Sequence, residues 1–202
     1  MSAVRILVLG LVRDLGQGHG YQVRRELLRW RADSWAHVAP ASIYQALRTL
    51  SKHGLLETVG TESGGGPERT VYRITPDGET EFFQLLRNAV SDPQDDLDAL
   101  SAAFGFLHLL PAREVAGLLE YRVRALWARL VAVDPPAEPA AAGPDCPVVV
   151  VVQPPEGKPP QVAALGRLIA AQLRADIDWS LDLAGRIRDG TFTFGEHSTS
   201  KA

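Results

Sequence analysis

The chain has 202 residues, of which 46% are hydrophobic and 22% are charged, and its net charge is −3. This composition is typical of a soluble globular protein with one large or two small domains. It excludes a strongly basic nucleic-acid binder, so any DNA-binding interpretation depends on the placement of particular residues. The single cysteine, Cys146, rules out an intrachain disulfide and fits a reducing cytoplasm. The apolar run near the N-terminus is too short to span a bilayer and no cleavage site follows it, so we expect a cytoplasmic protein.

The first two helices are expected at residues 3–15 and 21–31, separated by the glycine-rich sequence GQGHG. The first is apolar around nearly its whole circumference, so it should be buried centrally. The second presents Tyr21 and Gln22 in its first turn, where free N–H groups can hold a phosphate. His19 stands alone among glycines, and such a histidine is more often a loop residue than a ligand.

A connector of residues 32–39 leads to Pro40–Gly54, which predicts a third helix with proline in the first turn and glycine as the stop. Apolar residues at helical spacing form one buried stripe, and polar residues occupy the opposite side. An arginine side chain can form two hydrogen bonds to one guanine, and a glutamine side chain can form two to one adenine. This helix face therefore suits the major groove of DNA. Taken alone, the stretch fits an ordinary solvated helix better, but its neighbours favour DNA. The stripe is Ile43, Ala46, Leu47 and Leu50, and the polar set is Ser42, Tyr44, Gln45, Arg48, Thr49 and Lys52.

Two strands are expected next, at Leu55–Val59 and Arg69–Ile74, joined by the flexible tip GTESGGGP. Three helices followed by a hairpin make a winged helix. The wing carries Arg69 and Arg73, which can reach phosphates of a DNA backbone. Thr75 and the proline after it supply an N-cap and a first helical residue, so another helix should begin there.

Four sequence motifs occur in a fixed order over residues 4–90: ILVLGLV, GHGYQV, SIYQALRTLSKHGLLE and VYRITPDGE. This order and spacing resemble the PadR family of transcriptional regulators. The resemblance implies a winged helix-turn-helix domain at residues 1–90 that binds DNA. It also implies that the helices of the C-terminal half build a homodimer.

The second half, residues 91–190, is expected to be a helical dimerisation and effector domain, followed by a flexible tail at 191–202. Apolar residues at helical spacing mark 113–133 and 161–189. A proline-rich linker at 134–160 contains the valine run Val148–Val152, for which we expect a short strand or a segment laid along the dimer. Two such helices cannot be buried against the wing alone, so a second copy should cover them. The expected dimer interface consists of Leu119, Val123, Leu126, Leu165, Leu173 and Trp179.

The sequence offers no arrangement for catalysis. Its five histidines are scattered and its one cysteine cannot make a zinc site. No phosphate loop, dinucleotide fingerprint or nucleophile elbow is present. We therefore expect a protein that is not an enzyme and has no metal and no cofactor.

The aromatic residues of the second half allow two interpretations. Packing of the helical core is the favoured one for Phe104, Phe106 and Trp127. The family resemblance allows a second, in which a flat, apolar or aromatic effector binds between the dimer helices. Its candidate contacts are Phe104, His108 and Trp127.

The sequence thus predicts a mainly α protein, with an α+β winged helix and a helical second domain. The expected function is that of a homodimeric repressor that binds double-stranded DNA at a palindromic operator. The alternative is a winged-helix module that binds protein, with a dimeric helical scaffold and no specific DNA binding. The expected DNA contacts are Tyr21, Gln22, Ser42, Tyr44, Gln45, Arg48, Lys52, Arg69 and Arg73.

Overall fold

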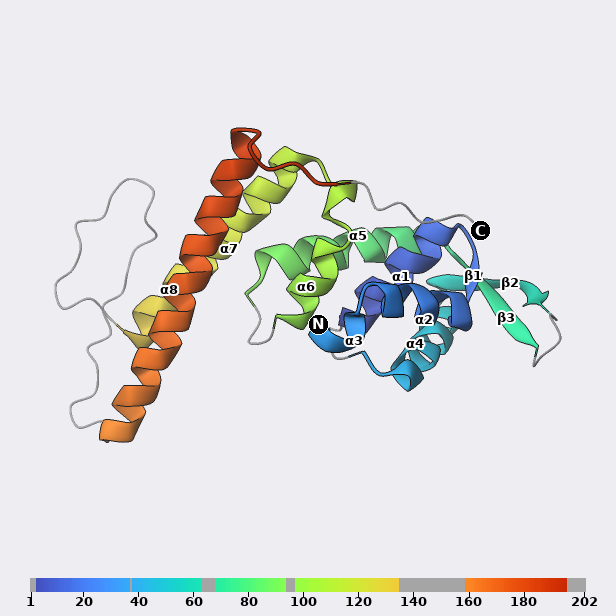
Figure 1. Cartoon of the computed structure of the whole chain (residues 1–202), viewed down its shortest axis with the longest axis horizontal. Coiled ribbons are helices and arrows are strands. Elements are labelled where there is room, and N and C mark those ends of the chain that lie inside the picture. The colour runs from blue at the N-terminus through green and yellow to red at the C-terminus, as the bar shows by residue number, and fades with distance from the viewer. Residues whose placement is uncertain (1–2, 37, 63–67, 94–96, 135–158, 196–202) are drawn as a thin grey trace. The chain divides into compact units, whose positions relative to one another are not determined.

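The structure is a computed structural model, and it divides the chain into two compact units (Figure 1). The first unit contains Met1–Val90, Gln94–Pro111 and Phe194–Ala202, and the second contains Ser91–Pro93 and Ala112–Thr193. Residues 94–111 therefore group with the first unit, whereas the sequence analysis put a boundary after residue 90. The described residues are 3–36, 38–62, 68–93, 97–134 and 159–195.

The first unit is a winged helix, so the fold class predicted from the sequence is confirmed. An antiparallel sheet has the strand order β1-β3-β2. The strands are β1 (Gly18–His19), β2 (Leu56–Glu62) and β3 (Arg69–Ile74). The helices are α1 (Ala3–Leu15), α2 (Gly20–Arg29), α3 (Ala32–Trp35), α4 (Pro40–Lys52), α5 (Pro76–Ser91) and α6 (Asp98–Phe104), followed by the 3₁₀ helix η1 (Leu107–Leu109).

The region before α4 differs from the sequence prediction. The second helix ends at Arg29 rather than Arg31, because Arg31 adopts a left-handed conformation with φ of 53°. A short helix, α3, then occupies the expected connector, and the Trp35 indole donates to the carbonyl of Trp30 at 2.8 Å. This hydrogen bond stabilises the compact turn between the two helices.

The glycine-rich break after α1 contains the short strand β1, which the sequence did not reveal. Gly18 pairs with Tyr72 and His19 pairs with Val71. Two residues are too few to show an alternating pattern, so only the pairing defines this strand. It fastens the start of α2 to the wing.

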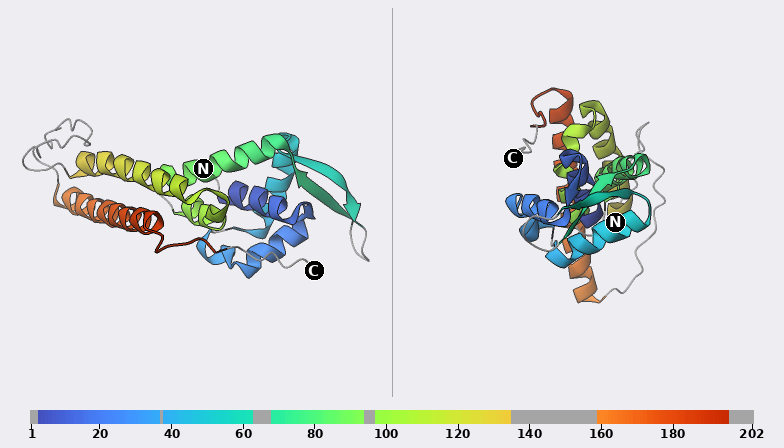
Figure 2. Two further views of the ribbon diagram at one scale, coloured as in Figure 1. Left: turned by 90° about the horizontal axis from the view of Figure 1, so that it is seen from above. Right: turned by 90° about the vertical axis from the view of Figure 1, so that its right-hand side faces the viewer.

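The wing itself is longer than predicted. Strand β2 continues to Glu62, opposite Arg69, and its pairing is irregular between Thr58 and Gly60. The two strands project from the helices as a ribbon in Figure 2. Residues 63–67 of the expected tip lie outside the described part of the chain.

A close helix contact lies at the centre of the first unit. Helix α1 is largely buried, as predicted, and Gly10 on it lies against the ring of Phe106. A Cβ added at residue 10 would lie 2.3 Å from Phe106 Cζ, so only glycine allows this approach. The same ring lies 5.4 Å, between centroids, from the rings of both Trp30 and Phe82. Phe106 therefore packs the core, as the favoured interpretation predicted.

The junction between α4, the wing and α5 is fixed by Thr75. Its Oγ1 donates to the carbonyl of Gly54 at 2.7 Å and accepts the Gly78 N–H at 3.1 Å. The second bond is the predicted N-cap of α5. Gly54 has φ of 74°, which confirms the left-handed stop after α4. An added Cβ at Gly78 would lie 2.0 Å from the carbonyl oxygen of Leu55.

The second unit contains α7 (Ala112–Val133) and α8 (Pro160–Arg188), which lie side by side in Figure 2. The two helices cover each other, so a second copy is not needed to bury these apolar faces, contrary to the sequence argument. Their shared core consists of Val123, Leu126, Leu130, Ala170, Leu173 and Ile177.

A buried polar cluster joins the same two helices. Arg122 is almost fully buried, and its Nε and Nη2 donate to the two carboxylate oxygens of Asp176 at 3.0 and 2.6 Å. Ser180 adds a hydrogen bond to Asp176 at 3.2 Å. Arg122 also donates to the carbonyl of Asp92 at 3.4 Å. The fork geometry fixes how α7 and α8 align along their axes.

Several expectations concern residues outside the described part of the chain. These are the Val148–Val152 run, expected as a strand or as a segment along the dimer, all but the ends of the linker, and the tail from residue 196. Helix α8 ends before Asp189, where hydrogen bonds from the side chain and backbone of Thr191 lower the pKa of the Asp189 carboxyl.

None of the helices in the described ranges has the length and apolarity needed to cross a bilayer.

Candidate nucleic-acid interface

Helix α4 has the two faces that its sequence predicts. Ile43, Leu47 and Leu50 are buried, and Ala46 is half-buried. Gln45, Arg48, Thr49 and Lys52 are exposed, together with Tyr44, which is 41% exposed. The buried stripe attaches α4 to the unit and leaves the polar side open to a ligand.

Three side chains of this polar side are uncommitted. Within the described ranges, Gln45, Arg48 and Lys52 have no hydrogen bond or ion pair to another side chain. The Ser42 hydroxyl differs, because it donates to the carbonyl of Ala39 at 2.6 Å and can only accept from a ligand. An amide, a guanidinium and an ammonium group on one helix face are the donors used to bind base edges and phosphates.

The start of α2 lies close to this face. A Cβ at Gly20 would lie 2.5 Å from Tyr44 Cε1, so glycine lets the ring of Tyr44 rest on α2. Gln22 takes part in a capping box, in which its Oε1 accepts the His19 N–H at 3.0 Å and its own N–H donates to His19 Nδ1 at 3.2 Å. Only the amide NH₂ of Gln22 is left for a phosphate, and one N–H of the first turn is already used.

The two wing arginines have different surroundings. Arg73 Nε donates to Glu57 at 2.8 Å on the neighbouring strand. The Arg69 guanidinium lies over the ring of Tyr21, 4.9 Å from its centroid. Arg69 is therefore the wing arginine whose N–H donors stay available, while Arg73 is partly neutralised by its partner.

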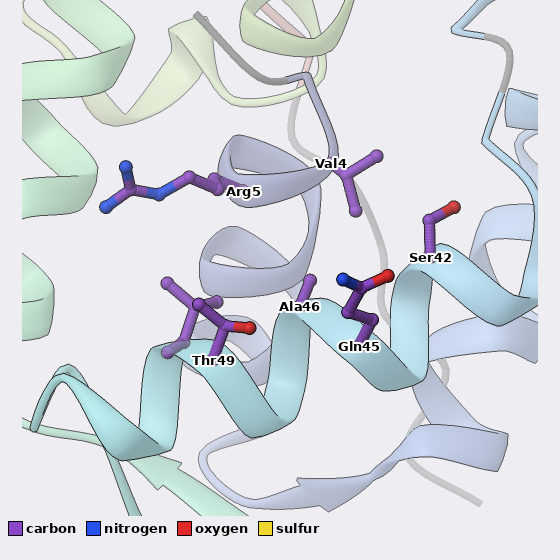
Figure 3. Close-up of a pocket in the computed structure, with 7 residues that line it drawn as sticks. Val4, Arg5, Ser42, Gln45, Ala46 and Thr49 are labelled. Carbon is purple, nitrogen blue, oxygen red and sulfur yellow. The ribbon is translucent and has the colours of Figure 1, made fainter.

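A pocket of about 240 Å³ opens between α4 and the first turn of α1. Figure 3 shows Ser42, Gln45 and Ala46 of α4 on one side of it and Val4 of α1 on the other. The Arg5 side chain, which also lines it, is paired with Glu81 at 2.7 Å. The pocket adjoins the polar face of α4 and brings α1 beside it.

Some of the expected interface and effector residues are buried in the structure, and others are exposed. Leu119, Val123, Leu126 and Leu173 are buried within the chain itself, so the structure does not offer them to a partner. Leu165 and Trp179 remain exposed, at 55% and 40%. Of the effector candidates, Phe104 and His108 are half-buried in the first unit, whereas Trp127 of the second is 48% exposed. Core packing is therefore the wrong interpretation for Trp127.

The sequence analysis missed three groups near this surface. They are the buried His19, whose Nδ1 caps α2, and the wing acids Glu57 and Glu62. Glu57 and Glu62 act through partners brought near by folding, whereas the capping of α2 by His19 had a local signal, the Gln22 three residues later. Among the described residues, no group of three or more His, Cys, Asp or Glu side chains is placed to hold a metal ion.

The fold and the site together define a winged-helix protein in which the polar face of the third long helix, α4, is open. Residues 8–84 match the model of the transcriptional regulator PadR-like family, which confirms the resemblance over the winged helix. No curated protein matches the chain.

Two solved structures are similar to the chain over most of its length. One is Bacillus subtilis PadR in complex with operator DNA, with 18% identity, a TM-score of 0.41, and coverage of 93% of this chain and 98% of that one. The other is smu.1604c from Streptococcus mutans UA159, with 15% identity, a TM-score of 0.39, and coverage of 95% of this chain and 99% of that one.

Proposed function

We propose that this chain is a DNA-binding transcriptional regulator of PadR type that acts as a repressor by occupying a palindromic operator as a homodimer. The observation that carries the proposal is the uncommitted set Gln45, Arg48 and Lys52 on the exposed face of α4, within the segment that matches the family model. In this proposal α4 enters the major groove, and Gln45 and Arg48 read base edges. Ser42, Tyr44, Lys52 and Arg69 bind edges or phosphates.

The first experiment is titration of the purified protein against DNA from upstream of its own gene, followed by fluorescence anisotropy at several salt concentrations. Scrambled DNA serves as the competitor. Tight binding that resists the competitor and weakens steeply with salt supports the proposal. Weak binding that ignores both sequence and salt would favour the alternative, in which the same helix face binds a protein.

Arg48→Ala is expected to weaken operator binding by about 1–3 kcal/mol and to relax the preference at one base pair, because a bidentate contact to guanine is lost. Scrambled DNA should lose much less. Arg48→Lys should restore the charge but not the base preference, since an ammonium cannot form the fork. Anisotropy titrations on operator and single-base variants measure both effects. The control is Arg124→Ala, which removes an exposed arginine of α7. If Arg48→Ala lost the same affinity on all DNA sequences, Arg48 would instead be a phosphate contact.

The dimer part of the proposal is supported by a second apolar stripe on α8. Leu165, Leu168, Ala171, Ala175 and Trp179 recur at helical spacing on the exposed side of the helix. The side of α8 that faces α7 is separate and already covered. A second copy would remove this stripe from water. A flat effector would in turn stack on Trp127.

Leu165→Asp is expected to convert the dimer to a monomer, because it places a charge within an apolar contact. The residue is exposed in the chain, so folding should be preserved. Leu181→Asp is the matched control: Leu181 is 45% exposed on a different side of α8. Light scattering gives the mass of each variant, and circular dichroism checks the fold. A dimer that survives Leu165→Asp would contradict this interface.

A further inference from the structure

The outer half of the wing is attached to the first turn of α2 by two side chains. Glu62 and Arg69 are opposite each other in the pairing of β2 with β3. Glu62 lies 3.6 Å from Nε2 of His19, and the Arg69 guanidinium lies 4.9 Å from the ring centroid of Tyr21. One cross-strand pair therefore contacts both the N-cap residue of α2, His19, and Tyr21 in its first turn.

This turn is a firm support. His19 is buried, pairs with Val71 in the sheet and shares a capping box with Gln22. The Tyr21 ring lies beside His19, with its centroid 6.2 Å from that of the imidazole. The ring itself is 47% exposed, so its face is accessible where Arg69 lies over it.

The way in which Arg69 is held leaves its hydrogen-bonding groups free for a ligand. An arginine over an aromatic face interacts through its flat side, and its N–H donors point outward around the edge. Arg73 shows the contrast, because its Nε is bonded to Glu57. A guanidinium held over a ring, with no hydrogen bond to another described residue, can bind phosphate oxygens with a smaller loss of side-chain freedom than an unsupported one.

We propose that Tyr21 is a positioning residue, whose ring holds the Arg69 guanidinium ready to bind a phosphate of the DNA backbone. This rests on the proposed function and replaces the expectation that Tyr21 itself binds the phosphate. The two roles differ in the part of Tyr21 that matters. Positioning needs the ring, whereas direct binding needs the hydroxyl.

The test is anisotropy titration, at several salt concentrations, of Tyr21→Ala, Tyr21→Phe, Arg69→Ala and the double variant. Tyr21→Ala should weaken binding by about threefold, the size of an exposed cation–π contact, and Tyr21→Phe should recover most of this loss. The double variant should bind no more weakly than Arg69→Ala alone. Arg69→Ala should lower the salt slope by about 1, and Tyr21→Ala should lower it in the same direction.

Leu28→Ala is the matched control, because Leu28 is on the same helix and 48% exposed. It should leave affinity and salt slope unchanged. If Tyr21→Phe loses as much as Tyr21→Ala, the hydroxyl binds the phosphate and the inference is wrong. Independent losses that multiply in the double variant would also overturn it, and the proposed function would still stand if Arg48→Ala relaxed the base preference as expected. A wild-type protein that binds no DNA would overturn the proposed function itself.

Discussion

Gly78→Ala is expected to destabilise the winged helix by about 3 kcal/mol or more, the upper range for a forced overlap in a packed site. An added Cβ would lie 2.0 Å from the Leu55 carbonyl oxygen, which already accepts the Thr75 N–H at 3.1 Å. This oxygen belongs to the backbone between α4 and the wing, so it cannot move aside as a side chain would. Urea unfolding followed by circular dichroism measures the loss.

Gly60→Ala is the matched control for this substitution, because Gly60 lies in the wing and an added Cβ would meet nothing within 4 Å. The control should change stability by less than about 0.5 kcal/mol. The Gly78 variant should also lose DNA affinity, since the junction fixes α4 and the wing together. Equal stability of the two variants would show that the close approach at Gly78 is absent.

The second large effect is expected at the polar cluster of the α7–α8 pair. Asp176→Ala should cost about 3–5 kcal/mol, because it leaves the buried Arg122 guanidinium without its counter-ion. The value should fall toward the lower end, since Asp176 keeps some exposure. Thermal unfolding of the variant measures it.

Two further variants show whether the stability loss of Asp176→Ala comes from the unpaired buried charge or only from the loss of a contact. The double variant Arg122→Met with Asp176→Leu should recover most of the stability, as apolar replacements of buried ion pairs do. Asp134→Ala breaks an exposed ion pair with Arg174 between the same helices and should cost less than about 1 kcal/mol. If the double variant were as unstable as Asp176→Ala, the packing of α7 against α8 would depend on the Arg122–Asp176 ion pair itself.

The parts of the fold that could be predicted are those in which local sequence and tertiary packing agree. Helix α4 is an example, since its apolar stripe, its first-turn proline and Gly54 all indicate the same bounds. Thr75 likewise combines a capping side chain with a following proline. The polar face of α4 could be assigned for the same reason, because a helix with a known buried side has a known exposed side.

The parts that could not be predicted depend on residues distant in sequence. His19 is a loop residue among glycines until the distant Val71 pairs with it in the sheet. Nor could spacing show whether the apolar residues of α7 face α8 or a second copy. On α8, Leu173 is buried against α7 whereas Leu165 is exposed, although both belong to the apolar pattern of that helix.

The contact between Gly10 and Phe106 also has an evolutionary consequence. Since the ring occupies the space where a side chain at residue 10 would lie, the size allowed at one position depends on the residue at the other. Related proteins with alanine or a larger residue at the first position should therefore carry a smaller one at the second. A change at either site alone would leave a clash or a cavity, so the two should be inherited as a matched pair.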